Sequence, residues 1–250
     1  MNLTEEQLLE NWNDLIKIID DNFEGERKEK LKTMYEGFQE RMMYAPASSK
    51  EHFHNCFIGG YVEHVLRVVK CADQTYNLWK SMGSSMEGYT REELFFSALN
   101  HDLGKIGDMD GDAYIPNPSD WHRKNQGSLY IPNPDTPFSM VPDRGLFLLN
   151  QFGIKYSFNE YLGIKLHDGM YDESNKPYYI SYNPSSRLQI NLPHVLHHAD
   201  MMASQIEYER WKATDTPKSK TITRKSKSIT GSDKSINTDK IFKDLFGDTK

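Results

Sequence analysis

Residues 99–105 read LNHDLGK, in which an adjacent histidine and aspartate follow Asn100 at the end of an apolar run over 94–99. The pattern predicts a helix over 91–103, and Gly104 lies where this helix would end. Adjacent helical side chains point about 100° apart, but at a helix end His101 and Asp102 can both reach one ion. Divalent metals bind such mixtures of nitrogen and oxygen ligands. The stretch therefore predicts part of a metal site, to which other segments must add ligands.

The composition is typical of a cytoplasmic globular protein. Of the 250 residues, 26% are charged and 37% are apolar, which allows a soluble fold with a real core. No apolar run approaches the roughly 18 residues of a membrane span, and the N-terminus shows no secretory signal pattern. Cys56 and Cys71 form neither a disulfide framework nor a metal-binding pair, so we expect free buried thiols in a reducing cytoplasm.

The first 48 residues predict a helical scaffold that packs on the core. A capping box in TEEQ at residues 4–7 begins a helix whose apolar residues recur at helical spacing as far as Ile19. Gly25 interrupts this pattern, and a second helix is expected over 26–43.

Three further helices are expected to carry histidines. Paired glycines at 59 and 60 precede a long helix with His64, and they permit close backbone packing at its start. A helical segment ending at Leu166 leads into His167, and a last helix is expected over 192–212. In that helix His197 and Asp200 share a face. Its core face is expected to hold Leu196, Ala199, Met202, Ala203 and Ile206.

Residues 107–145 differ in kind, since they are rich in Pro, Gly, Asn and Asp. The pentapeptide YIPNP occurs at 114–118 and again at 130–134, which is too few copies for a solenoid and favours a hairpin-like excursion with two equivalent arms. The acidic run DMDGD at 108–112 lacks the glycine and glutamate positions of a calcium loop, so we interpret it as a polar loop.

The chain beyond residue 212 predicts a basic flexible tail. Residues 213–250 contain nine Lys or Arg and five Asp, which gives them a net charge of +4. Since the whole chain carries −6, residues 1–212 carry −10. A Ser/Thr/Lys-rich composition over 216–231 predicts disorder. The apolar residues between Ile241 and Phe246 are typical of a terminal docking peptide, or of a short helix that folds back on its own domain.

The order of these motifs resembles the HD superfamily of metal-dependent phosphohydrolases, whose signature is H…HD…D on an all-helical core. The resemblance rests on GGxxxH ending at His64, HDLGK at 101–105 and LHxxD ending at Asp200, and it covers 53–211. The chain most resembles the HDxGK subgroup, which includes HD-type 3′–5′ exoribonucleases and cyclic-dinucleotide phosphodiesterases. Many phage and bacterial HD proteins share this order of motifs. The resemblance implies an all-α HD-domain helical bundle over 49–212 with a loop insertion at 107–145.

The resemblance also implies roles for individual residues. It makes His64, His101, Asp102 and Asp200 the ligands of a first divalent metal, and Asp102 would bridge to a second ion held by His167 and His197. Lys105 would neutralise charge on the phosphate. His122 is a further candidate near the second ion, whereas His194 and His198 are weaker candidates and His52 and His54 could line the entrance.

The substrate implied is a nucleotide or a short single-stranded nucleic-acid end. The acidic body argues against a basic track for duplex DNA, because phosphate affinity needs clustered Lys and Arg. Loop aromatics could instead stack a base, and the expected substrate contacts are His122, Arg123, Lys124 and Tyr171. Mixed imidazole and carboxylate ligands suit Mn²⁺, Fe²⁺, Ni²⁺ or Co²⁺, with Mg²⁺ as a further option.

Two other interpretations compete with the enzyme. The first is a catalytically silent HD-fold adaptor that attaches to a replication or transcription assembly through residues 241–246. The second is that the histidines are structural and their order is accidental. Either the enzyme or the adaptor would work in the cytoplasm, which is the host cytoplasm if a phage encodes the chain.

Overall fold

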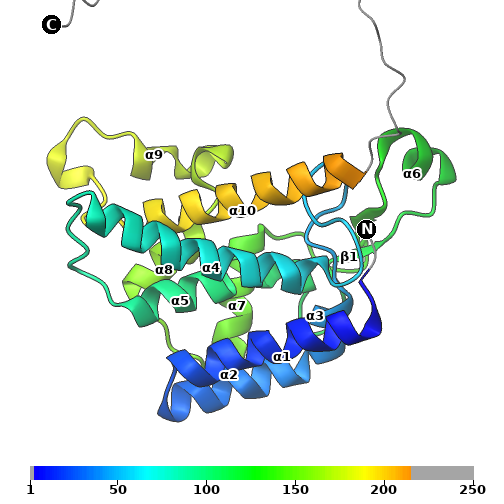
Figure 1. Ribbon diagram of the computed structural model, residues 1–250, viewed down its shortest axis with the longest axis horizontal. Coiled ribbons are helices and arrows are strands. Elements are labelled where there is room, and N and C mark those ends of the chain that lie inside the picture. The colour runs from blue at the N-terminus through cyan, green and yellow to red at the C-terminus, as the bar shows by residue number, and fades with distance from the viewer. Residues whose placement is uncertain (1–2, 215–250) are drawn as a thin grey trace, which may run out of the picture. The chain divides into compact units, whose positions relative to one another are not determined.

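The computed structural model describes residues 3–214, and this part of the chain is mostly helical. The predicted all-α fold with a hairpin-like insertion is therefore confirmed for these residues (Figure 1). The predicted flexible tail and its docking peptide lie outside the described residues, apart from positions 213 and 214. No helix within 3–214 combines the length and the apolar character needed to cross a membrane.

The N-terminal scaffold consists of α1 (Glu5–Asn22), α2 (Gly25–Gly37) and α3 (Gln39–Tyr44). The single helix expected over 26–43 is wrong, because the chain leaves helical geometry at Phe38, with φ −107° and ψ 13°. Gly37 weakens the helix at this point, and the buried Phe38 ring packs edge-on against Phe152 at 5.6 Å between centroids.

The central helices are α4 (Gly60–Ser81), α5 (Arg91–Asn100), α8 (Phe158–Leu166) and α10 (Leu192–Thr214). In Figure 1, α1 and α2 lie along one side of α4 and α5, and α10 packs along α4 on the other side. The face of α10 differs from the expectation, because Met202 is exposed and Glu207 is buried. The core of α10 thus contains a carboxylate where the pattern predicted only apolar side chains.

The scaffold contributes to the same core as the central helices. Trp12, Leu15 and Tyr35 belong to the cluster of buried residues that also contains Leu99. The Tyr35 hydroxyl lies 3.0 Å from the Leu99 carbonyl oxygen and 3.1 Å from Oδ1 of Asn100. A side chain of α2 therefore holds the last turn of α5, immediately before His101.

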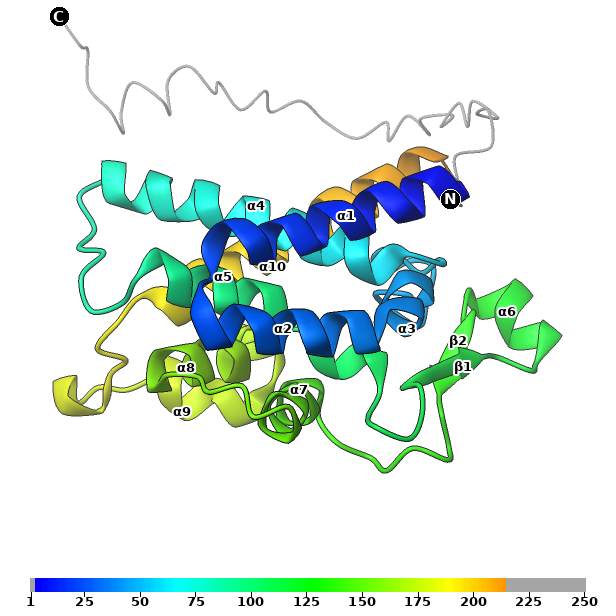
Figure 2. The same cartoon turned by 90° about the horizontal axis from the view of Figure 1, so that it is seen from below.

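The insertion forms an antiparallel hairpin of β1 (Tyr114–Pro116) and β2 (Tyr130–Pro132). The two YIPNP repeats supply these strands, so the prediction of two equivalent arms is confirmed. Between them lies α6 (Asp120–Gln126), a helix that the sequence analysis did not expect; Ser119 caps it. Figure 2 shows the hairpin extending from the helices, with α6 at its outer end.

The remaining elements connect the core helices. Before and after the hairpin lie the 3₁₀ turn η1 (Leu103–Ile106) and helix α7 (Val141–Gln151), which pack on each other. A Cβ atom at Gly104 would overlap the Val141 carbonyl oxygen, so glycine allows this contact. The segment between α8 and α10 contains only short elements: η2 (Gly169–Tyr171), η3 (Glu173–Asn175), α9 (Lys176–Tyr179) and η4 (Pro184–Ser186).

Candidate metal centre

His64 lies in the second turn of α4, whose start depends on the paired glycines. Gly59 has a left-handed φ of 86°, and a Cβ atom at Gly60 would overlap the backbone carbonyl oxygen of Asn55. The expected close backbone packing is therefore confirmed. It brings the loop before α4 against the helix and leaves the His64 side chain fully buried.

Two histidine–aspartate pairs follow helix ends in the same way. His101 comes directly after α5 and His167 directly after α8, with φ/ψ of −56°/−41° and −59°/−34°. Each Nδ1 lies within hydrogen-bond distance of the carbonyl oxygen three residues earlier, at 2.7 Å for His101 and 2.8 Å for His167. The predicted helix through residue 103 is wrong, since α5 ends at Asn100 and Asp102 takes φ −105° and ψ 12°.

These contacts fix the tautomer of the histidines. A carbonyl or carboxylate oxygen only accepts, so Nδ1–H must donate in each contact. His64 follows the same rule, with Nδ1 3.0 Å from Oε2 of Glu207, and His101 and His167 donate to the carbonyl oxygens described above. Each Nε2 is then left to bind a metal, which is the usual arrangement of histidine ligands in proteins.

Three donor atoms surround Nε2 of His64. This atom lies 3.2 Å from Oδ1 of Asp200, 3.4 Å from Oδ2 of Asp102 and 3.4 Å from Nε2 of His101. Nε2 of His101 lies 3.4 Å from the same Asp102 oxygen and 3.9 Å from Asp200. Ligands about 2.1 Å from a common ion lie roughly 3.0–3.5 Å apart, so these buried side chains can hold a metal ion.

Asp102 presents its second oxygen to the other histidine–aspartate pair. Its Oδ1 lies 3.6 Å from Nε2 of His167, and that nitrogen lies 3.6 Å from Oδ2 of Asp168. His167, Asp168 and Asp200 form a second group whose donor atoms all lie within 4.8 Å of one another. The two oxygens of Asp102 thus face different histidines, and the second group contains Asp168 where the resemblance implied His197.

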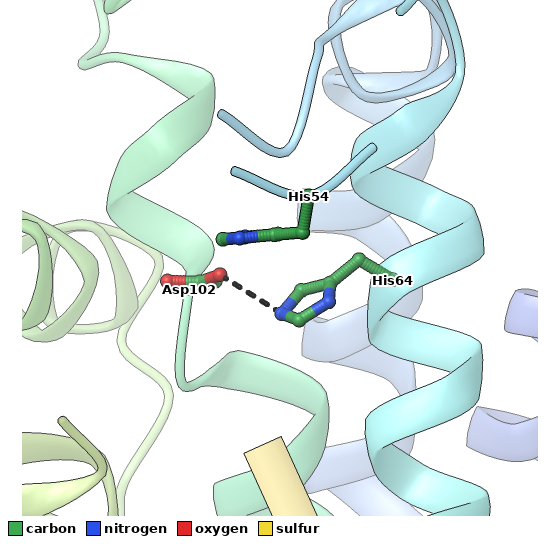
Figure 3. Close-up of side chains that lie close together, drawn as sticks. All are labelled: His54, His64 and Asp102. Carbon is green, nitrogen blue, oxygen red and sulfur yellow. Dashed lines mark ion pairs between the residues drawn. The ribbon is translucent and has the colours of Figure 1, made fainter. Parts of the chain in front are cut away.

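Lys105 and His54 complete one side of the centre. Nζ of Lys105 lies 2.6 Å from Oδ2 of Asp102 and 3.4 Å from Nε2 of His54. Figure 3 shows the His54 ring beside His64, with both facing Asp102, and the two ring centroids are 4.7 Å apart. His54 belongs to a third potential metal-binding group with His64 and Asp102. From the sequence, His54 was expected only to line the entrance.

Glu207 is the residue that sequence reasoning missed. It is buried on α10, and its Oε1 accepts a hydrogen bond from Nε of Arg67 at 2.9 Å while Oε2 faces His64. Arg67 also donates to Glu63 at 2.7 Å. The available signal was spacing: Glu207 comes seven residues, or about two helical turns, after Asp200, and so lies on the same side of α10.

The charges of the centre act strongly on one another. Burial lowers the pKa of His64, but the carboxylates of Glu207, Asp102 and Asp200 outweigh burial and raise it well above its usual value. For His167, burial is likewise outweighed by Asp168, Asp102 and Asp200, which raise the pKa to about 9. The pKa of Asp102 is well below its usual value, because Lys105 and His101 overcome the effect of burial. The acidic side chains of the centre thus favour a positive charge among the histidines.

Other predicted residues lie elsewhere. Nδ1 of His197 lies 2.8 Å from the His167 carbonyl oxygen, and its ring covers Gly169, but His197 joins none of the metal-sized groups within 3–214. The rings of His194 and His198 pack against Trp79. Exposed side chains are found at His52 and Tyr171.

The basic stretch of α6 also lies apart from the centre. Nδ1 of His122 contacts Oγ of Ser119 at 2.7 Å, and Arg123 bonds to Asn117 and Asp120. Within the described part of the chain, no hydrogen bond or ion pair joins 122–124 to the centre. Figures 1 and 2 place α6 beyond the strands of the hairpin. These residues are not brought to the metal centre by the fold.

Comparisons with protein-family models, with curated proteins and with solved structures find no match to this chain.

Proposed function

We propose that this protein is a metal-dependent phosphohydrolase of the HD type, which cleaves a phosphate ester of a nucleotide or of a single-stranded nucleic-acid end. One observation carries the proposal: the imidazoles of His64 and His101 and the carboxylates of Asp102 and Asp200 converge at ligand spacing in a buried site. The ammonium group of Lys105 lies directly beside them.

The residues around the ligands have complementary roles in this proposal. A bound divalent ion would supply Lewis acidity and lower the pKa of water toward neutrality, so that no side-chain nucleophile is needed. Glu207 holds the imidazole of His64 in the tautomer that leaves Nε2 available. Lys105 offers a half-buried positive charge that balances Asp102 and can face a phosphoryl oxygen.

The ligand set also favours particular metals. Several imidazoles combined with two or three carboxylates suit Mn²⁺, Fe²⁺, Ni²⁺ or Co²⁺ better than Mg²⁺, which prefers oxygen ligands alone. The two oxygens of Asp102 face different histidines, which supports a site for two ions with this carboxylate between them.

A hydrolysis panel tests the proposal. The purified full-length protein would be supplied with Mn²⁺, Ni²⁺, Co²⁺ or Mg²⁺ and assayed against nucleotides, cyclic dinucleotides and labelled single strands of RNA and DNA. We expect turnover of one class, its loss in Asp102→Ala and its retention in Asp14→Ala, a control at an exposed carboxylate of α1. Bound metal without turnover of any substrate would contradict the proposal and favour the adaptor, whose docking peptide lies outside the described residues.

A further inference from the structure

A cavity of about 790 Å³ lies beside the metal centre, and Lys105 belongs to both. The side chain of Lys105 lines the cavity, while its Nζ atom contacts Asp102. Small-molecule sites typically measure about 300–1,000 Å³, so the cavity has the size of a ligand pocket. Lys105 is therefore the residue that links the cavity to the centre.

The repeated pentapeptide supplies one wall of this cavity. In the hairpin Tyr114 pairs with Pro132 and Pro116 pairs with Tyr130, so these side chains point to the same face of the ladder. Tyr114, Pro116 and Tyr130 all line the cavity. Ile115 pairs with Ile131 and points to the other face. The repetition thus places two tyrosines diagonally across one small apolar surface.

The opposite wall comes from the N-terminal scaffold and α7. Phe38, Tyr44 and Phe152 line it, together with Arg41. Arg41 is fixed on both sides: its guanidinium lies 5.1 Å from the centroid of the Phe38 ring, and its Nε lies 2.8 Å from Oδ1 of Asp112. Arg41 also donates to the carbonyl oxygens of Asp108 and Gly111. These contacts tie the base of the hairpin to α3, so the two parts of the cavity lining are held together.

We propose that this cavity binds the nucleobase of a mononucleotide, with its phosphate directed past Lys105 to the metal centre. Aromatic walls accept the flat face of any base, and the carboxylate of Glu40 offers a hydrogen-bond acceptor for its edge. The inference rests on the proposed function, which it narrows from phosphate esters in general to single nucleotides. The α6 surface is then not the substrate site.

Binding of free nucleosides tests the cavity without requiring metal or hydrolysis. The four common ribonucleosides and their deoxy forms, with ribose as the base-free probe, would be titrated into the metal-free full-length protein and followed by saturation-transfer NMR. We expect at least one nucleoside to bind through its base protons and ribose to give no comparable signal. In Tyr130→Leu the affinity should fall roughly five- to a hundredfold, the usual value of a base–aromatic stack.

Matched variants separate stacking from folding. Tyr130→Phe retains the ring and should keep affinity within about twofold, and Tyr182→Leu changes an exposed tyrosine and should have no effect. Thermal melts would establish that each variant is folded, and Tyr114→Leu provides a second test of the same wall. Nucleosides that bind no better than ribose, or unchanged binding in folded Tyr130→Leu and Tyr114→Leu, would overturn the inference.

The two proposals can fail separately. Base-dependent binding without hydrolysis of any substrate in the panel would contradict the phosphohydrolase alone. Hydrolysis of nucleotides by a protein that shows no preference for nucleosides over ribose would contradict the base pocket alone.

Discussion

The two histidine–aspartate pairs at helix ends have the same backbone conformation at the histidine but differ in how deeply the aspartate is buried. His101 and His167 have nearly the same torsion angles and the same Nδ1 contact to a carbonyl oxygen three residues earlier. The side chain of Asp102 is only 3% exposed, whereas that of Asp168 is 42% exposed. A helix end therefore orients the histidine, and the chain that follows decides what the aspartate can do.

The two aspartates differ in exposure because the chain takes a different path after each of them. After Asp102 the chain turns inward through η1, which α7 covers, and Lys105 returns to contact the carboxylate. After Asp168 the chain takes a left-handed turn at Gly169, with φ 56°, and leads to the exposed Tyr171. We infer that Asp102 is the central ligand and Asp168 an outer one. The following predictions test this ranking, from the largest expected effect to the smallest.

The largest expected difference is in the Mn²⁺ affinity lost when each aspartate is replaced. Asp102→Asn removes the carboxylate that faces both groups of histidines, so we expect Mn²⁺ affinity to fall by at least about a hundredfold. Asp168→Asn should weaken binding only about tenfold, because the side chain is half exposed and serves one group. Calorimetric titration measures both, and equal losses in the two variants would remove the distinction between the helix ends.

The two histidines should each affect a different ion. His101→Gln removes a ligand next to His64 and Asp102, and we expect it to abolish tight binding at the first site. His167→Gln should leave one ion per chain, since only the second group contains His167. Elemental analysis after gel filtration gives the stoichiometry. Two ions retained in either variant, or none in both, would show that the two groups are not separate sites.

His64 is oriented by the side chain of Glu207, whereas His101 and His167 are oriented by carbonyl oxygens at helix ends. Replacing Glu207 therefore tests how His64 is held. Glu207→Gln weakens the acceptor of the Nδ1 hydrogen bond, and loss of such a partner typically lowers metal affinity about 10- to 100-fold. The matched control is Glu209→Gln, at an exposed position of the same helix. Affinity should be unchanged there. The same affinity in both variants would mean that His64 needs no carboxylate partner.

The turn after the second pair should be sensitive to a single methyl group. Gly169→Ala must adopt a left-handed φ, which costs about 1–2 kcal/mol, and its Cβ atom would overlap the ring of His197. Gly153→Ala meets the same backbone cost at φ 63° but contacts only the flexible end of Lys30. Urea unfolding should show Gly169→Ala to be less stable than Gly153→Ala by at least about 1 kcal/mol. Equal stabilities would mean that His197 moves freely away from the turn.

Much of the fold could be read from the sequence because its signals are local. The Thr4 capping box is present, with Gln7 reciprocating, and the YIPNP repeats form paired strands. The break at Phe38 was missed because Gly37 is only a weak local signal and the Phe38 ring packs against Phe152, more than a hundred residues away. The end of α5 at Asn100 similarly depends on side-chain contacts of His101 and Tyr35 rather than on helix propensity.

The residues of the candidate site likewise include some that the sequence predicted and some that it did not. His64, His101, Asp102 and Asp200 could be selected because they form an ordered motif, and the fold brings them together. Glu207 was missed because a buried carboxylate on an apolar face resembles a solvent-exposed one until its partners, His64 and Arg67, are placed in space. His122 was selected for its residue type and its basic neighbours, and nothing in the local sequence shows that α6 holds it apart from the centre.

The most direct test of the central claim is a crystal structure of the full-length protein grown with Mn²⁺, with anomalous diffraction used to locate the metal. The account predicts a strong peak within bonding distance of Nε2 of His64 and His101, Oδ2 of Asp102 and Oδ1 of Asp200. A second, weaker peak is expected between Asp102 and His167. Anomalous density only at surface carboxylates, with the His64 cluster free of metal at saturating Mn²⁺, would contradict the account.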